Sequence, residues 1–330
     1  MPTIKDVAQL SGISKTTVSR VINNKGYVSE EKKALVLKAM EELEYYPNLA
    51  ARRLRGQLTT TIGVIVPKIT NPFFSYLVDA IEEAAYEKGY QVLIFQSNED
   101  PKKELTFLNL LKTKQVDGVI MTSVENDWTK VKSFIKHGPI VLCNVYIEES
   151  TVPTVRLNQY KGTYDGVKHL IERGHRKIAY CTGGFFKKEG RGKERNQGYQ
   201  KALEEAGISI NLNWIFVNQH SIEDGKQVLR KVLEMEEKPT AVFTGSDEVA
   251  SGMIAEASVH GIRIPDDLAI MGFDDQPIAR VVSPKLTTIK QPVDQLGEKA
   301  VEIIIDELNN AQSLDPYYEL PIELIIRQST

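Results

Sequence analysis

Small polar and basic side chains gather near the start of the chain, in a pattern suited to contact with nucleic acid. Between Thr3 and Asn23 the apolar spacing predicts two helices joined by a tight turn at Gly12, with Ser14 capping the second helix. The outward face of that second helix carries Lys15, Thr16, Thr17, Ser19 and Arg20. These side chains can donate hydrogen bonds to base edges and phosphates, and none of them is acidic. On spacing alone, a three-helix packing module with a solvated face remains the alternative.

A second short segment with basic character follows. Asn48 can cap a helix over residues 49–55, and Gly56 can end it. Because about seven residues lie well below the ~12–15 that an isolated helix needs in water, we expect this helix to form only against a partner. A basic linker is the alternative interpretation. The arginines of the segment are Arg52, Arg53 and Arg55.

No arrangement of residues in the sequence argues for catalysis. A G-x-S-x-G elbow is absent, and the glycine-rich residues 183–192 match neither the P-loop nor the dinucleotide fingerprint. We expect a solvated loop there, with contact to an acidic effector as the second interpretation. The five histidines show no metal spacing, and two cysteines offer no zinc cluster. The sequence therefore predicts a protein that is not an enzyme and holds no cofactor or metal.

Charge is unevenly distributed along the 330 residues. Residues 1–60 have a net charge of +4 and the remainder a net charge of −7, which indicates a basic, polyanion-binding head on an acidic body. Cys143 and Cys181 lie in apolar runs without a C-x-x-C motif, which favours a reducing compartment. The start lacks the apolar core of a signal peptide, and no apolar run approaches the ~18–20 residues of a membrane span. We therefore expect a cytoplasmic protein without membrane contact.

The spacing of apolar residues changes at about residue 62, from helical throughout to β-branched runs that alternate with amphipathic helices. Such alternation predicts parallel sheets with helices on both faces. Candidate strands span 62–66, 91–95, 118–122, 140–145, 177–182, 214–217, 241–245, 269–273 and 287–291. Glycines suited to the left-handed residue just past a helix end precede many of them, at Gly89, Gly138, Gly174, Gly207 and Gly261. About nine strands are too many for one doubly wound domain, so we expect two similar α/β lobes.

The amino-terminal residues resemble the DNA-binding head of the lactose/galactose repressor (LacI/GalR) family. The resemblance lies in TIKDVAQLSGISKTTVSRVINN at 3–24, GYVS at 26–29 and YPNLAARRL at 46–54. It extends over essentially the whole chain, because an α/β body of family length follows in the expected order. The implied fold is an all-α helix-turn-helix head followed by an α/β body of two doubly wound parallel-sheet lobes, like those of periplasmic binding proteins.

The resemblance also implies domain boundaries. A helix-turn-helix domain is expected over 1–47, a hinge helix and linker over 48–61, and an effector-binding and dimerisation domain over 62–330. Within this last domain, lobe 1 is expected at about 62–160 and 291–318, and lobe 2 at about 161–290 and 319–330.

The family match implies a set of DNA contacts. In the family the hinge helix pairs with that of its dimer mate in the minor groove, and Leu54 matches the leucine that is wedged into the central base step and kinks the duplex. Arg52, Arg53 and Arg55 would lie near phosphates. The full implied set is Thr3, Lys5, Ser14, Lys15, Thr16, Thr17, Ser19, Arg20, Asn23, Lys25, Tyr27, Asn48, Ala51, Leu54 and Arg55.

The family match also implies an effector cleft between the lobes, with residues at strand ends and in the loops that follow. The implied set is Phe73, Phe74, Asn144, Arg195, His220, Ser246 and Asp274. Asn144 stands where the family usually has an aspartate, and His220 lies near a position that is often aromatic. An aromatic face with Arg and Asp making paired hydrogen bonds to hydroxyls suits a polyol. Phe73 and Phe74 as core residues, and Asp275 as a turn cap, are alternative interpretations.

These expectations combine into a homodimeric transcriptional regulator, expected to be a repressor, that binds double-stranded operator DNA and is switched by a sugar-like effector. Effector binding would change the lobe angle and so part or join the hinge helices. The alternative is a catabolite-control-type regulator switched by a phosphorylated carrier protein. Tyr46 and Glu302 stand where that branch has its phosphate-binding arginines, which argues against it. A nucleotide-using enzyme is an alternative from another class, which the absent glycine fingerprint disfavours. A sugar-transport protein is a further alternative, which the DNA-binding head disfavours.

Overall fold

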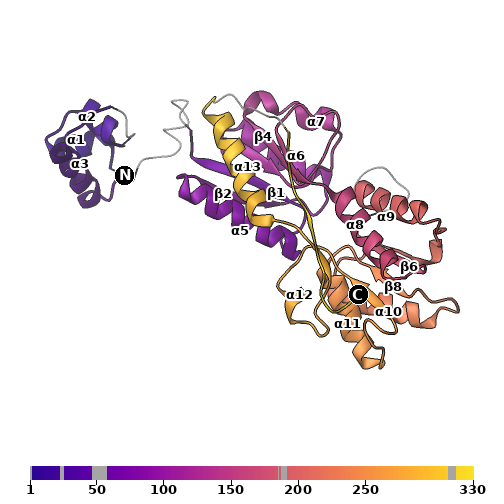
Figure 1. Ribbon diagram of the computed structural model, residues 1–330. Coiled ribbons are helices and arrows are strands. Elements are labelled where there is room, and N and C mark those ends of the chain that lie inside the picture. Colours follow the sequence, from indigo (N-terminus) through magenta and orange to yellow (C-terminus); the bar gives the residue numbers. More distant parts are fainter. Residues whose placement is uncertain (1, 23–25, 47–57, 185, 187–191, 311–316) are drawn as a thin grey trace. The chain divides into compact units, whose positions relative to one another are not determined.

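The computed structural model describes residues 2–22, 26–46, 58–184, 186, 192–310 and 317–330. The chain divides into two compact units, residues 1–59 and residues 60–330 (Figure 1). Among the helices of the described ranges, none is both long and apolar enough to cross a membrane.

The first unit is a three-helix head. Its helices are α1 (Ile4–Ser11), α2 (Lys15–Ile22) and α3 (Glu30–Glu42). Each helix contributes a fully buried valine to one core, namely Val7, Val18 and Val36. Gly12 ends α1 in the left-handed conformation with φ 67°, which a residue without a Cβ adopts readily, so the chain turns sharply into α2.

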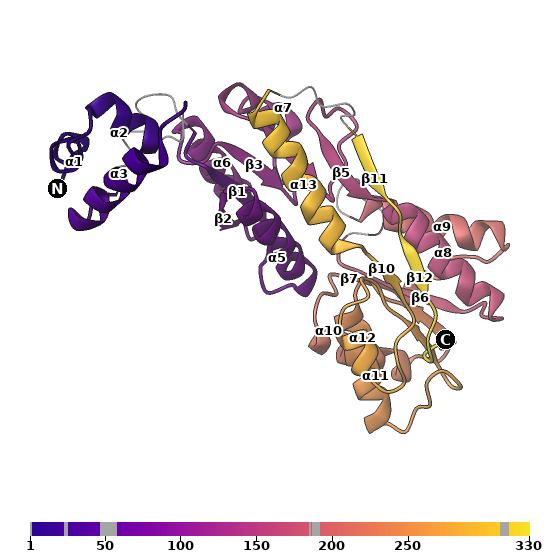
Figure 2. The same cartoon turned by 60° about the vertical axis from the view of Figure 1, so that its left-hand side comes forward.

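The second unit begins with a six-stranded parallel sheet, in the order β11-β5-β4-β3-β1-β2 (Figure 2). The strands are β1 (Thr61–Val66), β2 (Gln91–Gln96), β3 (Gly118–Met121), β4 (Ile140–Cys143), β5 (Thr154–Leu157) and β11 (Tyr317–Leu320). The helices that cover it are α5 (Pro72–Glu87), α6 (Pro101–Lys112), α7 (Trp128–Lys132) and α13 (Val293–Leu308), with a 3-10 turn, η1, at Ile135–His137. Val64 packs towards α5 and α13, whereas Ile65 packs towards α6 and α7, as the alternation of strand side chains requires.

A second parallel sheet, of four strands in the order β7-β6-β8-β9, forms the other lobe. Its strands are β6 (Ile178–Thr182), β7 (Ile215–Val217), β8 (Ala241–Phe243) and β9 (Ala269–Met271). Helices α8 (Gln159–Glu172) and α9 (Lys193–Glu205) share a core with one face, and α10 (Ile222–Glu234) and α11 (Asp247–Val259) share a core with the other. Two short helices, η2 (Leu212–Trp214) and α12 (Ile278–Val281), complete this lobe. The prediction of two doubly wound lobes is thereby confirmed.

Three connections in the described chain run between the lobes. The first joins β5 to α8, and the second joins β10 (Thr288–Lys290) to α13. The third joins β11, in the six-stranded sheet, to β12 (Glu323–Ile325), which pairs antiparallel with β10. The polar residues at these connections can therefore meet side chains of both lobes.

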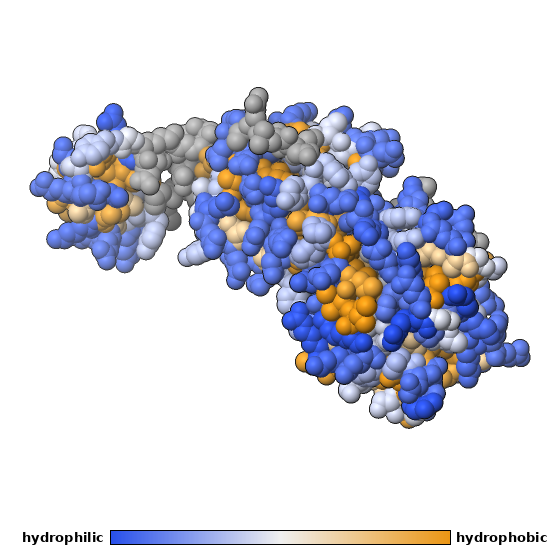
Figure 3. Space-filling view, in the orientation of Figure 1, coloured by the Kyte–Doolittle hydropathy of each residue, from blue (hydrophilic) through white to orange (hydrophobic). Residues whose placement is uncertain are grey.

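The face seen in Figure 3 is mostly hydrophilic, with separate apolar patches, as expected where helices bury their apolar sides against sheets.

The structure corrects several details of the sequence prediction. Strands β5, β11 and β12 were not predicted, and β4, β8 and β9 end two residues before the predicted strands do. The expected left-handed conformation at Gly138 is wrong, because its φ of 165° is extended. Glycine is required there for a different reason, since a Cβ would lie 2.6 Å from the backbone oxygen of Asp117.

Candidate functional site

The second helix of the head begins with a compact hydroxyl cluster. Thr17 donates its backbone N–H to Ser14 Oγ at 3.2 Å, and the two hydroxyl oxygens lie 2.9 Å apart. Ser14 therefore occupies the capping position that the sequence predicts. At the start of α1, Thr3 donates its backbone N–H and its hydroxyl to the carboxylate of Asp6, at 2.7 and 2.8 Å. These bonds hold the starts of both helices in defined conformations.

The outward side chains of the head differ in exposure. Lys5, Lys15, Thr16 and Arg20 are exposed, whereas Thr17 and Ser19 are partly buried. Tyr27, in the turn before α3, is 94% exposed. The exposed first turn of α2 is thus polar and basic, which is what contact with base edges and phosphates requires. Part of the predicted DNA-binding set lies outside the described residues, namely Asn23, Lys25, Asn48, Ala51, Leu54 and Arg55. The same holds for Arg52 and Arg53, which were expected to lie near phosphates.

In the body, Arg195 lies in the first turn of α9. It donates to Gln159, at the connection between the lobes, and to Gly245, which follows β8 in lobe 2. Its Nε donates to Gln159 Oε1 at 2.7 Å, and its Nη1 donates to the backbone oxygen of Gly245 at 2.8 Å. The guanidinium carbon lies 3.7 Å from the centroid of the Phe273 ring. The ring and the two acceptors fix the plane of the guanidinium, and burial lowers its pKa against the opposing effect of Asp274.

Asp274 is buried and is joined to Arg195 through two glutamines. Its carboxylate accepts hydrogen bonds from Gln276 Nε2 at 3.0 Å and from Gln291 Nε2. Gln159 Nε2 donates in turn to Gln291 Oε1 at 2.8 Å and to Asn144 Oδ1 at 3.1 Å. Asn144, Arg195 and Asp274, which the sequence predicts together, therefore share one hydrogen-bonded network, called here the glutamine chain.

The electrostatics of this network follow from its burial. Burial raises the pKa of Asp274 to about 7, although Arg195 and the two amide donors favour the charged form. Burial also raises the pKa of Asp247, at the start of α11, well above its ordinary value, and the nearby Asp274 adds to this. Asp247 accepts a hydrogen bond from the Thr288 hydroxyl and one from the Gln276 backbone N–H at 2.7 Å. The hydrogen bonds that Asp274 and Asp247 accept therefore come from neutral donors, and Arg195 acts on Asp274 through its charge.

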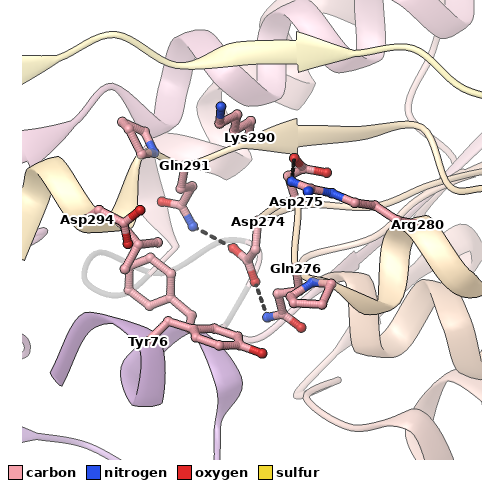
Figure 4. A pocket seen from close by; sticks show the side chains of 12 residues that line it. Tyr76, Asp274, Asp275, Gln276, Arg280, Lys290, Gln291 and Asp294 are labelled. Atoms are coloured by element: carbon pink, nitrogen blue, oxygen red, sulfur yellow. Dashed lines mark hydrogen bonds and ion pairs between the residues drawn. The ribbon is translucent and has the colours of Figure 1, made fainter. Parts of the chain in front are cut away.

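A pocket of about 250 Å³ opens beside Asp274 (Figure 4). Phe73 and Asp274 of the predicted effector set line it, together with Gln291, Tyr76 and Lys290. Phe73 also belongs to the core of the first lobe, so both interpretations of this residue hold. Phe74 meets the Phe73 ring edge-on, with the ring centroids 5.2 Å apart, and packs against the same core.

The other two predicted effector residues, Ser246 and His220, lie three residues beyond strands β8 and β7 of lobe 2. Ser246 caps α11, since its Oγ accepts from the Val249 backbone N–H at 3.3 Å, and it directly follows the carbonyl that Arg195 contacts. His220 is exposed. Its backbone N–H donates to Asp224 at 2.9 Å, and its ring packs on Gly183, where an added Cβ would lie 2.7 Å from Cε1. His220 therefore contacts Gly183, just beyond β6, and Asp224 in α10.

Three polar residues of the cleft were missed from the sequence. Gln159 follows β5, which the sequence did not predict, and Gln291 lay inside the predicted strand 287–291 although β10 ends at Lys290, so no local signal marked either residue. Ser123, two residues beyond β3, has a buried Oγ without a hydrogen-bond partner among the described residues. It lies at the same edge of the first sheet as Asn144, where an unmet hydroxyl can pair with a ligand.

The residues considered for phosphate capture do not form a cationic site. Tyr46 is exposed, and Glu302 accepts a bond from Lys299 at 2.7 Å. A carboxylate at this position repels phosphate, so the catabolite-control alternative is not favoured.

A three-helix head with a polar, basic second helix and a two-lobed α/β body with a buried polar cleft define a ligand-responsive DNA-binding regulator. The chain belongs to the LacI family of bacterial regulatory proteins. Residues 3–48 match the model described as bacterial regulatory proteins, lacI family, and residues 59–326 match the model of periplasmic binding proteins and the sugar binding domain of the LacI family.

Individual relatives agree with this membership. The NTD biosynthesis operon regulator NtdR of Bacillus subtilis is 44% identical over the whole length of both chains. A LacI family regulator from Lactobacillus casei with bound sucrose has a TM-score of 0.77 at 35% identity, covering 82% of this chain and 99% of its own. The lac repressor dimer bound to operator and an anti-inducer has a TM-score of 0.86 at 26% identity, covering 99% and 98%. These relatives are transcriptional regulators, which confirms the prediction that the chain is a regulator and not an enzyme.

Proposed function

We propose that this regulator is a homodimeric repressor whose operator affinity is switched by a sugar-like molecule bound between its two lobes. The observation that carries the proposal is the glutamine chain, in which Gln159 and Gln291 at the lobe connections join Arg195 to Asp274 of the second lobe. The Lactobacillus casei relative with bound sucrose supports a sugar as the ligand class. As a DNA-binding regulator, the protein would act in the cytoplasm.

The chemistry of the cleft suits a polyol. A guanidinium and a carboxylate each form two directed hydrogen bonds, which match the donor and acceptor of neighbouring hydroxyl groups. Sugar hydroxyls can replace the amides of Gln159 and Gln291 as partners, so that Arg195 and Asp274 stay satisfied when the ligand enters. Phe73 supplies an apolar face at the edge of the pocket.

The switch follows from the three connections between the lobes. We assign the moving units as 62–160 with 291–318, and 161–290 with 319–330. A ligand that contacts both units favours one angle between them, and it shifts the equilibrium by its difference in affinity for the two arrangements. In each protomer the head and the hinge segment over 48–61 would respond, through the dimer, by binding or releasing the operator.

A thermal-shift panel of sugars, sugar phosphates and purines tests the ligand class. A ligand that binds only the folded protein raises the melting temperature, and at 100 times its Kd it adds about 2.7 kcal/mol. We expect at least one sugar to stabilise the wild type and to have no effect on Arg195→Ala. Stabilisation by purines alone, or by no compound in the panel, would contradict a sugar effector.

A further inference from the structure

The backbone that carries Asp274 has an unusual conformation. Asp274 has φ 113° and Asp275 has φ 57°, so two successive residues with side chains take positive φ values. Residues other than glycine avoid this region, and they stay in it only where surrounding contacts hold them. The peptide N–H of Asp274 donates to Ile289 at 2.7 Å and that of Gln276 donates to Asp247 at 2.7 Å, so the turn between them is left with one further anchor, at Asp275.

The carboxylate of Asp275 supplies that anchor. It is buried and forms ion pairs with Arg327 at 2.5 Å and with Arg280 at 3.1 Å. The two arginines differ in their surroundings, because the Arg327 side chain is 14% exposed and that of Arg280 is 63% exposed. An exposed ion pair contributes little to structure, so Arg327 is the partner that matters.

Arg327 is itself fixed to the segment that leads into β10. Its Nη1 donates to the backbone oxygen of Leu286 at 2.8 Å, and its backbone N–H donates to Thr287 Oγ1 at 2.9 Å. That segment ends at Gln291, whose amide contacts the Asp274 carboxylate. Arg327 therefore ties together the two stretches of chain that meet at Asp274.

We infer that Arg327 is a positioning residue for the effector site: through Asp275 it holds the turn that aims the Asp274 carboxylate at the cleft. Arg327 does not line the pocket in Figure 4, and it acts on the ligand only through Asp274. The inference rests on the proposed function in so far as Asp274 binds the effector. The effect of Arg327 on the orientation of Asp274 does not depend on the identity of the effector, because it can be measured in the ligand-free protein.

The titration of Asp274 distinguishes positioning from simple charge pairing. Loss of a nearby cation can only raise the pKa of a carboxylate, whereas release of a buried carboxylate into solvent lowers it. Arg195 lowers the pKa of Asp274 and Glu248 raises it. Asp247 and Asp274 also interact, because each carboxylate disfavours a charge on the other, and all three of these groups are unchanged in the experiment. A fall in the pKa of Asp274 after removal of Arg327 is therefore a sign of movement.

The experiment is a pH titration of aspartate carboxyl ¹³C signals in the full-length, ligand-free protein. The Asp274 signal is assigned by its loss in Asp274→Asn. In Arg327→Gln we expect its midpoint to fall from about 7 by about one unit or more, towards the ordinary value of about 3.9. The matched control is Arg263→Gln, which removes an arginine bound to exposed Asp267 at 2.6 Å and should leave the midpoint unchanged.

Arg327→Lys serves as the second variant, and circular dichroism checks the folding of each. Lysine keeps the cation but lacks the planar fork with which arginine contacts Asp275 and Leu286 through two separate nitrogens, so we expect a smaller fall in the same direction. An unchanged or raised midpoint in a folded Arg327 variant would overturn the inference. The titration and the sugar panel can fail separately. If the Asp274 midpoint falls in the Arg327 variants while no sugar stabilises the wild type, the sugar effector is rejected and the positioning of Asp274 by Arg327 still holds.

Discussion

Arg156 Nη1 lies 2.9 Å from Glu194 Oε1, so an ion pair joins strand β5 of one lobe to the first turn of α9 in the other. The Arg156 side chain is almost completely buried, and its guanidinium also lies 4.8 Å from the centroid of the Tyr146 ring. Glu194 directly precedes Arg195, so the pair holds the cleft arginine's helix to the first lobe. Such a contact favours the lobe arrangement seen in this structure over more open ones.

Glu194→Gln should therefore destabilise the body and loosen the association of the lobes. Because Glu194 is partly exposed, we expect a loss of about 1 kcal/mol in the free energy of unfolding, below the range for breaking a fully buried pair. Urea denaturation measures it. The matched control is Glu204→Gln on the same helix, where the pair with Lys201 is exposed on both sides and the change should be close to zero. Equal effects of the two substitutions would show that the Arg156 contact is no stronger than a surface pair.

The raised pKa of Asp274 predicts a dependence of stability on pH. Between the ordinary aspartate pKa and about 7, the folded protein holds a proton that the unfolded chain has lost. The free energy of unfolding should therefore fall as the pH rises through this window, by up to about 1.4 kcal/mol per unit, and level off above pH 7. Asp274→Asn removes the titration, so the difference in stability between the variant and the wild type isolates it. A difference that is constant from pH 5 to pH 8 would contradict the buried, protonated Asp274.

Operator binding should depend strongly on salt. Six basic residues of each protomer can each neutralise one phosphate, which predicts a slope on the order of −10 in a plot of log affinity against log salt concentration. These residues are Lys5, Arg20, Lys25, Arg52, Arg53 and Arg55. Fluorescence anisotropy with labelled operator at several salt concentrations measures the slope.

A fragment of residues 62–330 should lose operator binding. A slope near zero on specific DNA, or binding by the fragment, would contradict the assignment of the head.

Local pattern was sufficient to predict most of the fold. Val64 and Ile65 belong to a continuous β-branched run that can be buried on both faces, and such runs stand out between amphipathic helices. Strand β5 was missed because it contains Arg156, whose burial depends on residues outside its own segment, namely Glu194, Glu319 and Tyr146. Strands β11 and β12 are short and pair with strands that are distant in sequence, so no local feature marks them.

The site was predicted less completely than the fold. Arg195 and Asp274 were named because their surrounding motifs resemble those of a family. Gln159 and Gln291 were not, because their roles arise only when folding brings two amides 132 positions apart into contact. The support of Asp274 by Arg327 escaped prediction for the same reason, since Asp275 and Arg327 are 52 positions apart.

Operator affinity measured with and without a saturating sugar, in the wild type and in Arg195→Ala, tests the central claim most directly. The sugar is the one that stabilises the wild type in the thermal-shift panel. Coupling of about 1–3 kcal/mol predicts a change in wild-type affinity of roughly 5- to 150-fold. Loss of the guanidinium leaves ligand hydroxyls unpaired, which costs at least about 1–3 kcal/mol and should remove the response. We expect Arg195→Ala to bind operator as tightly as the ligand-free wild type at every sugar concentration. A full sugar response in Arg195→Ala would show that the protein does not sense its effector in this cleft.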